Sequence, residues 1–185
     1  MITISSIENA VITDQPQLLN DIFEQEKNIA IYQRDIEHLK PEVEEAMRKT
    51  IQVSASGTIQ DISSALETYF NTHLKHCPLL LKDIIEITKV FRQVTESSSF
   101  RVLFTTVNTN MCRRFHTDMN DLRLLCTYYG PGTLWLPENN VNRRALQDGL
   151  DNPAIIIDPH QVQQVNTGAV TLLKGAIFPN PGTRA

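Results

Sequence analysis

The pattern of apolar residues changes at the serine run 97–99, and this change limits what the chain can fold into. Before the run, apolar residues recur every three or four positions across 58–74 and across 80–94, with Pro78 between the two segments. Residues at this spacing share one face of a helix and proline ends the first segment, so two amphipathic helices are predicted. After the run, two segments between positions 100 and 129 are rich in β-branched and aromatic residues, which is typical of strands. We therefore predict an α+β fold.

Shorter segments extend this pattern toward both ends of the chain. Helices are predicted over 16–27, 41–47 and 142–150, and strands over 29–32, 133–136, 154–157 and 169–173. A chain of 185 residues is long enough to bury one core. We predict a single domain, 1–185, in which a mainly helical part, 1–98, packs on a strand-rich, barrel-like part, 99–185.

Charge and cysteine content narrow the classes of function. The net charge is -4 and the basic residues are scattered, so no basic surface for nucleic acid is predicted. The three cysteines are widely spaced and form no C-x-x-C pair, which argues against a disulfide framework. The N-terminus has no basic leader followed by an apolar stretch, and no run has the length of a membrane span. We expect a cytoplasmic protein that binds neither nucleic acid nor a membrane.

The most specific chemical feature is the H-x-D pattern formed by His116 and Asp118. If 112–118 is a strand, these two side chains lie on the same face, because side chains alternate along a strand. An imidazole and a carboxylate so placed, together with a distant second histidine, make the facial triad of non-haem iron(II) oxygenases. The alternative is structural: Asp118 begins a turn with Asn120 and Asp121, residue types that favour turns.

Two neighbouring side chains are candidates for the same site. Arg123 lies on the next predicted strand and can hold an anionic cosubstrate, because a guanidinium binds a carboxylate through two hydrogen bonds. It can equally form a salt bridge with Asp118 or Asp121. Tyr128 and Trp135 flank a glycine turn, where they either line a small-molecule pocket or belong to the core.

A longer segment resembles a known family. The segment reads H-T-D at 116–118, R-L-L-C-T-Y at 123–128 and G-P-G-T at 130–133, followed by a tryptophan at 135. This combination resembles the bacterial family named domain of unknown function 1826. The resemblance also includes 28–34, 155–159 and 168–175, so it covers most of the chain.

The resemblance implies a fold and a chemistry. The family is similar to iron(II)/2-oxoglutarate-dependent oxygenases in its H-x-D segment and its strand order, which implies a jelly-roll-like (double-stranded β-helix) set of strands. It further implies iron(II) bound by His116 and Asp118, with 2-oxoglutarate near Arg123 and Tyr128 as cosubstrate contact or pocket lining. The expected activity is that of a dioxygenase-like oxidoreductase acting on a small-molecule or protein substrate.

One element of the family pattern is missing. In relatives the lysine–glycine pair at 174–175 is followed by a histidine–arginine–serine motif, which supplies the distal ligand, whereas 176–185 contains no histidine. His160 precedes the last predicted strand and is interpreted as a turn histidine. The chain is then a shortened family member, a truncated product, or a protein whose third ligand is a different residue. Incomplete strands would leave an open sheet edge for a homodimer. The alternative function is a non-catalytic structural or partner-binding protein of the same fold.

Overall fold

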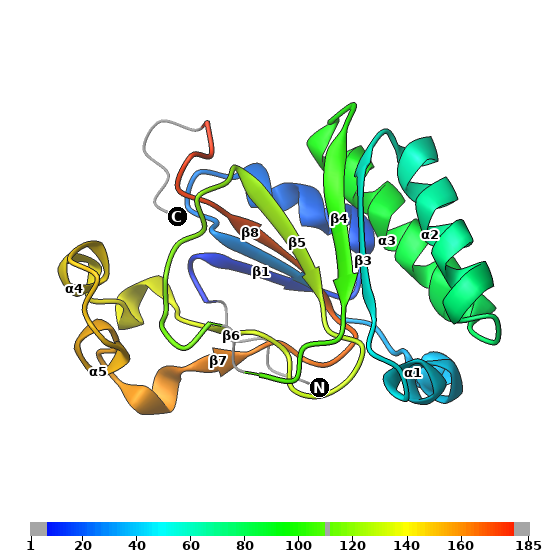
Figure 1. Cartoon of the computed structure of the whole chain (residues 1–185). Coiled ribbons are helices and arrows are strands. Elements are labelled where there is room, and N and C mark those ends of the chain that lie inside the picture. Colours follow the sequence, from blue (N-terminus) through cyan, green and yellow to red (C-terminus); the bar gives the residue numbers. More distant parts are fainter. Residues whose placement is uncertain (1–6, 110–111, 180–185) are drawn as a thin grey trace. The chain divides into compact units, whose positions relative to one another are not determined.

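The computed structural model describes residues 7–109 and 112–179, and the chain divides into two compact units (Figure 1). One unit comprises Met1–Arg34 with Cys112–Ala185, and the other comprises Asp35–Met111. Helices and strands occur in both units, so the predicted α+β class is confirmed. Within the described ranges, no helix has both the length and the apolar character needed to cross a membrane.

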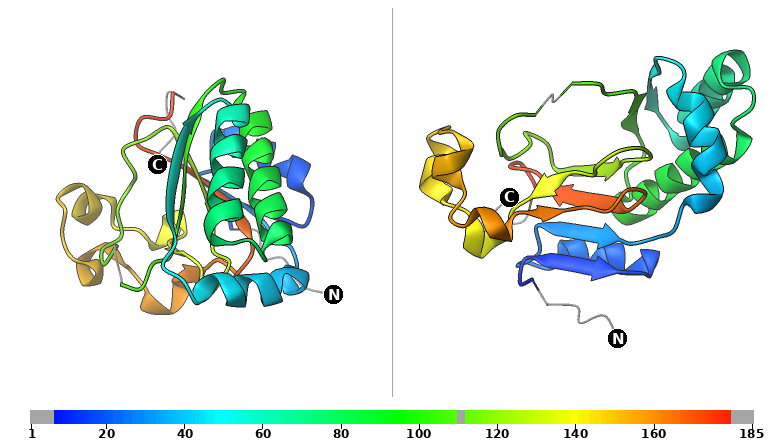
Figure 2. Two further views of the ribbon diagram at one scale, coloured as in Figure 1. Left: turned by 45° about the vertical axis from the view of Figure 1, so that its right-hand side comes forward. Right: turned by 90° about the horizontal axis from the view of Figure 1, so that it is seen from below.

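The unit Asp35–Met111 contains a two-stranded sheet and a pair of long helices, which lie side by side (Figure 2). Its elements are η2 (Glu37–Leu39), α1 (Lys40–Met47), β3 (Gln52–Gly57), α2 (Ile59–His73), α3 (Pro78–Thr95) and β4 (Phe100–Thr105). Helix α2 begins with a capping box: Thr58 Oγ1 accepts from the Asp61 amide, and Asp61 Oδ2 accepts from the Thr58 amide. Pro78, which was predicted to end the first helical segment, is the first residue of α3.

The apolar face of α2 is buried, as its spacing predicted. Ile62, Leu66 and Phe70 are all buried, and the Phe70 ring stacks on Phe104 of β4 with 5.9 Å between centroids. Strand β3, which the sequence analysis did not anticipate, pairs antiparallel with β4 along its full length. Its weak sequence signal reflects its position, because every second residue of β3 is exposed.

The other unit is built around a four-stranded sheet in the order β1-β2-β8-β5. Its elements are β1 (Ala10–Thr13), η1 (Pro16–Phe23), β2 (Ile29–Tyr32), β5 (Leu122–Cys126), β6 (Leu134–Trp135), η3 (Glu138–Asn140), α4 (Arg143–Gln147), α5 (Asn152–Ile155), η4 (Pro159–Gln161), β7 (Gln163–Gln164) and β8 (Val170–Lys174). Strands β1 and β2 are parallel, and the other pairs are antiparallel. The part predicted to be mainly helical therefore contributes β1 and β2 to the same sheet as β5 and β8.

Residues 122–174 form one long antiparallel hairpin whose two arms pair in three places. Strand β5 pairs with β8, β6 pairs with β7, and Val141 forms an isolated bridge with Ile156. Along the chain, β6 and β7 lie between β5 and β8, and Val141 and Ile156 lie between β6 and β7. The two arms therefore pair in the order expected for one hairpin. Gly132 allows a close approach between them, because a Cβ atom there would lie 2.2 Å from the Val165 carbonyl oxygen.

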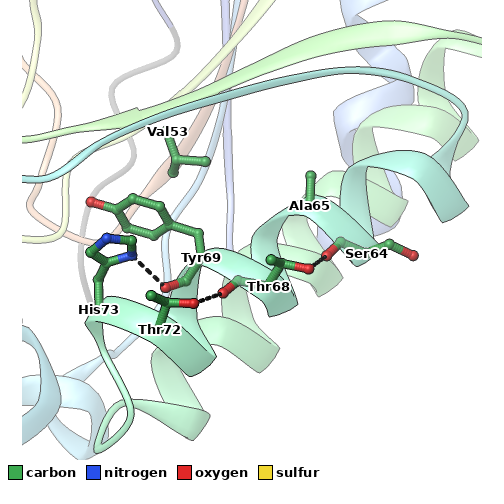
Figure 3. Close-up of a pocket in the computed structure, with 7 residues that line it drawn as sticks. All are labelled: Val53, Ser64, Ala65, Thr68, Tyr69, Thr72 and His73. Carbon is green, nitrogen blue, oxygen red and sulfur yellow. Dashed lines mark hydrogen bonds between the residues drawn. The ribbon is translucent and has the colours of Figure 1, made fainter.

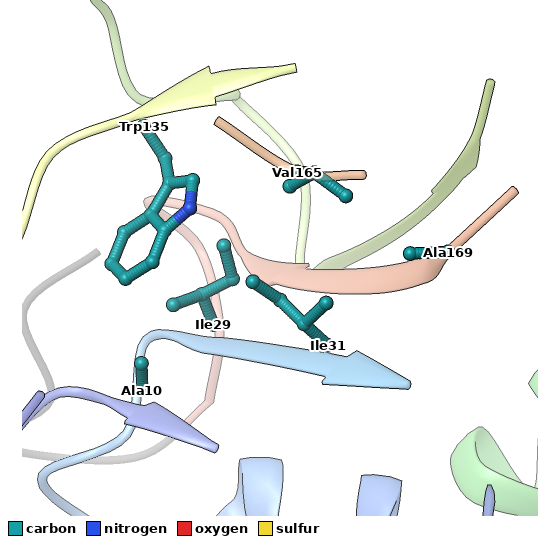
Figure 4. Close-up of a cluster of buried hydrophobic side chains, with 6 residues drawn as sticks. All are labelled: Ala10, Ile29, Ile31, Trp135, Val165 and Ala169. Carbon is teal, nitrogen blue, oxygen red and sulfur yellow. The ribbon is translucent and has the colours of Figure 1, made fainter. Parts of the chain in front are cut away.

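One buried hydrophobic cluster of this unit lies on one face of the four-stranded sheet (Figure 4). Directly paired residues share a face, and Ile29 pairs with Leu173 while Ile31 pairs with Thr171. The buried cluster on this face comprises Ala10, Ile29, Ile31, Trp135, Val165 and Ala169. Trp135 is thus a core residue. Of the two roles considered from the sequence, pocket lining and core packing, the structure shows core packing.

A buried hydroxyl in the core lacks a hydrogen-bond partner among the described residues. The Thr171 hydroxyl is buried and has no hydrogen-bond partner in the described part of the chain. Such a group costs about 1–3 kcal/mol. We expect Thr171→Val, which keeps the shape of the side chain, to raise the free energy of unfolding by about 1 kcal/mol in urea titrations. The control is Thr167→Val, which loses an exposed hydrogen bond to the Gly130 carbonyl and gains nothing. A lower stability for Thr171→Val would contradict this account.

Two predicted elements differ from the structure. The strand predicted over 154–157 was wrong, because Asn152–Ile155 forms the short helix α5 and Ile156 alone makes a β-bridge. Pro153 in the first turn explains the change, since its fixed φ suits a helix start and it offers no N–H to a ladder. The helix predicted over 16–27 is shorter, and η1 ends at Phe23 as a 3-10 helix.

Candidate functional site

The segment that carries the H-x-D pattern is not a strand, so that prediction was wrong. Residues 112–121 belong to no β-ladder, and the side chain of Asn152 holds the segment instead. Its amide nitrogen donates to the Arg113 carbonyl at 2.9 Å, and its amide oxygen accepts from the Phe115 N–H at 2.9 Å. The Arg114 guanidinium also donates to the Gly149 carbonyl. The segment therefore lies beside the connection between α4 and α5. The side-chain amide of Asn152 makes two hydrogen bonds to its backbone, as a neighbouring strand would in a sheet.

His116 and Asp118 nevertheless come together. His116 Nε2 lies 3.5 Å from Asp118 Oδ1, and the Asp118 side chain is 17% exposed. His116 Nδ1 lies 2.8 Å from the Arg114 carbonyl oxygen. A carbonyl only accepts, so Nδ1 is the donor in this bond, and Nε2 is the ring nitrogen that faces the carboxylate. This arrangement suits a metal-binding histidine, whose second nitrogen usually donates to a carbonyl or carboxylate.

Arg123 completes a cluster of three side chains. Its Nε lies 3.1 Å from Asp118 Oδ2, so the structure forms the salt bridge to Asp118 rather than one to Asp121. Asp121 Oδ1 instead accepts from the N–H of the next residue, Leu122, at 2.7 Å. The Arg123 side chain is 45% exposed, and its terminal nitrogens have no protein partner among the described residues.

The backbone after Asp118 is anchored to the chain that follows β8. Three consecutive amides after β8 donate to carbonyls in this backbone. The Gly175 N–H donates to Asp121 at 2.7 Å, the Ala176 N–H to Asp118 at 2.8 Å and the Ile177 N–H to Asn120 at 3.2 Å. A Cβ atom on Gly175 would lie 2.0 Å from the Asn120 carbonyl oxygen, so the two segments are in close contact. Asp118 is therefore held at its carbonyl by the Ala176 amide and at its side chain by Arg123.

The structure does not bring Tyr128 or His160 to this cluster. Tyr128 follows the far end of β5, roughly 15 Å along the strand from Arg123. His160 lies in η4, where its N–H donates to Asp158 at 2.9 Å. This bond, with one from Gln161, lowers the pKa of the Asp158 carboxyl, as expected for the acid that caps a turn. Among the described residues no group of three or more potential metal ligands is present.

Sequence reasoning missed two residues that shape this unit. Asn152 lies between the helix predicted over 142–150 and the strand predicted over 154–157, and an isolated asparagine has no signature of such a role. Lys174, at the end of β8, is buried and donates to the Glu24 carbonyl at 2.8 Å, beyond the last turn of η1. Its ammonium also lies 4.9 Å from the centre of the Phe178 ring. Burial lowers the pKa of Lys174, and the nearby charge of Glu26 opposes that shift.

The unit Asp35–Met111 offers a different kind of surface feature, a groove of about 460 Å³ between β3 and α2 (Figure 3). Its lining residues are Val53, Ser64, Ala65, Thr68, Tyr69, Thr72 and His73. The hydroxyls of Thr68 and Thr72 donate to carbonyls one turn earlier at 2.8 Å, and His73 Nδ1 lies 3.1 Å from the Tyr69 carbonyl oxygen. Two hydroxyls and one imidazole nitrogen of the groove are thus engaged within the helix, and the Tyr69 hydroxyl accepts from the Gln52 N–H of β3.

Comparison with known proteins gives one match. The family described as "Protein of unknown function (DUF1826)" matches residues 13–185. Searches of curated proteins and of solved structures found no match. The matched range contains the His116–Asp118–Arg123 cluster, Asn152 and Gly175, and it includes nearly the whole chain. The chain therefore belongs to the DUF1826 family.

Proposed function

We propose that this protein is a metal-dependent oxidoreductase of the iron(II)/2-oxoglutarate oxygenase type, with His116 and Asp118 as two ligands of iron(II). The observation that carries the proposal is the 3.5 Å separation of His116 Nε2 and Asp118 Oδ1. Two ligand atoms about 2.1 Å from one ion and at right angles to each other are roughly 3 Å apart, so only a small closure is needed. When bound, iron(II) together with 2-oxoglutarate would supply the electrons that activate dioxygen, and dioxygen would be the oxidant of the substrate.

The topology of the unit supports a jelly-roll reading. A jelly roll arises when a long antiparallel hairpin is rolled so that its nested strand pairs fall into two sheets. The pairs β5–β8 and β6–β7 are nested in this way and belong to different sheets. Arg123 pairs with Leu173 and so shares the sheet face that carries the Trp135 cluster. In a jelly roll this face is the interior, where such enzymes bind their cosubstrate.

Arg123 is the residue that we propose contacts 2-oxoglutarate. Its Nε holds Asp118, and its two terminal nitrogens remain for a carboxylate. Tyr128 has no part in this contact, because it lies roughly 15 Å along the strand. The proposed setting is cytoplasmic, with a small-molecule or protein substrate, and an edge strand of the four-stranded sheet is the proposed contact of a homodimer.

A non-catalytic role is the second candidate, and the salt bridge favours it. Asp118 Oδ2 already contacts Arg123, and Oδ1 already faces His116, so the carboxylate has partners for both oxygens without an ion. In that case the cluster stabilises the turn before β5, and the protein acts through a binding surface. The two candidates differ in whether His116 and Asp118 bind a metal ion.

An anaerobic titration with iron(II) and 2-oxoglutarate separates the two candidates. We expect a metal-to-ligand charge-transfer band in the wild-type protein that is absent in His116→Ala. The matched control is His160→Ala, which removes an exposed histidine from η4 and should leave the band unchanged. A wild-type protein without the band would rule out the oxygenase proposal and leave the non-catalytic candidate.

A further inference from the structure

We propose that Asn152 is a positioning residue for the His116–Asp118 pair. Its side-chain amide holds the backbone on both sides of Arg114, and the Arg114 carbonyl in turn orients the His116 imidazole. The metal-related part of this role rests on the proposed function. The control of the imidazole by Asn152 does not, because it follows from hydrogen bonds within the protein.

Asn152 is well placed to act as a fixed support. It is the first residue of α5, and its own carbonyl accepts from the Ile156 N–H at 2.9 Å. Ile155 on the same helix is fully buried, and its carbonyl accepts from the Asn142 N–H at 2.8 Å. The amide therefore projects from a backbone that is anchored in the core, whereas residues 112–121 have no ladder of their own.

The geometry links the amide to the reactive nitrogen in two steps. With the Arg113 carbonyl and the Phe115 N–H both bound by Asn152, the intervening Arg114 peptide cannot rotate freely. Its carbonyl stays 2.8 Å from His116 Nδ1, so Nδ1 donates to it and Nε2 is turned toward Asp118 as the ligand atom. Without Asn152 the Arg114 carbonyl is no longer held against Nδ1, and the Asp118 carboxylate beside Nε2 becomes the main hydrogen-bond acceptor for the ring.

The tautomer of His116 is the direct test, because a purely structural role would not change it. We expect nitrogen-15 NMR at about pH 8.5, where an ordinary histidine is neutral, to show the Nδ1–H form in the wild-type protein. Asn152→Ala should shift His116 toward the Nε2–H form, and Asn152→Asp, which can accept from Phe115 but not donate to Arg113, should lie between them. The control is the neighbouring Asp151→Ala, whose side chain makes no cap bond. The spectrum of His116→Ala assigns the signal.

Cobalt(II) calorimetry on the same variants tests the consequence for metal binding. We expect Asn152→Ala to bind cobalt(II) about 10-fold more weakly than the wild-type protein and Asp151→Ala equally well, as is usual for partners of a ligating histidine. An unchanged tautomer in a folded Asn152→Ala would overturn the inference. If Asn152→Ala does not fold, Asn152→Asp carries the same comparison. A wild-type protein that does not bind cobalt(II) would count against the proposed function alone, and the tautomer would still decide the role of Asn152.

Discussion

Asn140→Ala should lower the free energy of unfolding by about 2–4 kcal/mol, the largest loss that we expect from a single polar side chain. Asn140 is 1% exposed, and its amide makes two hydrogen bonds to the backbone of Asp158: Nδ2 donates to the carbonyl at 3.0 Å and Oδ1 accepts from the N–H at 2.7 Å. Alanine leaves both backbone groups without their partner and also opens a small cavity.

Urea unfolding measures this effect, and the chain supplies a matched control. Asn139 precedes Asn140 in the same short helix but is exposed, so Asn139→Ala should change the free energy of unfolding by less than about 0.5 kcal/mol. A loss below about 1 kcal/mol for Asn140→Ala would mean that water replaces the amide and that the two bonds do not hold Asp158 in place.

Gly175→Ala should be similarly destabilising, by about 3 kcal/mol, and should also disturb the candidate site. A Cβ atom at this position would lie 2.0 Å from the Asn120 carbonyl oxygen and 2.3 Å from its Oδ1, so backbone has to move. Asn120 lies two residues after Asp118. The carbonyl of Asp118 accepts from the amide of Ala176, the residue that follows Gly175. We therefore expect cobalt(II) affinity to fall along with stability.

The control for this substitution is Ala176→Ser, because Ala176 is exposed and the change adds only one small polar atom. Its unfolding midpoint and its cobalt(II) affinity should match those of the wild-type protein. If Gly175→Ala has the same urea midpoint as the wild-type protein, Gly175 does not contact Asn120 closely in solution. The chain after β8 then does not hold Asp118 in place.

Local patterns predicted the elements whose formation depends on their own residues. Helices α2 and α3 follow from apolar residues at helical spacing and from Pro78, and β2, β5 and β8 follow from runs of β-branched and aliphatic residues. Strand β3 and helix α5 escaped this reasoning. Strand β3 is half exposed, and the residues of α5 favour a strand by composition although Pro153 starts a helical turn.

The candidate site was found for a reason that was only partly correct. His116 and Asp118 were paired on the assumption that both lie on one face of a strand, and the structure pairs them in a segment without a ladder. The segment is held by the side chain of Asn152, which is 37 and 39 residues away from the backbone groups that it binds. No pattern within the segment could have indicated this support.

The sequence by itself determined the α+β class, most of the helices and strands, and the identity of the chemically distinctive residues His116, Asp118 and Arg123. These properties depend on residues that are close together in the sequence, so the sequence alone shows which side chains are neighbours. Only the tertiary structure decided the nested pairing of β5 to β8, the choice of Asp118 as partner of Arg123, and the roles of Asn140, Asn152 and Gly175. Each of these is a contact between segments far apart in sequence, and such contacts form only once the backbone has closed the loops between them.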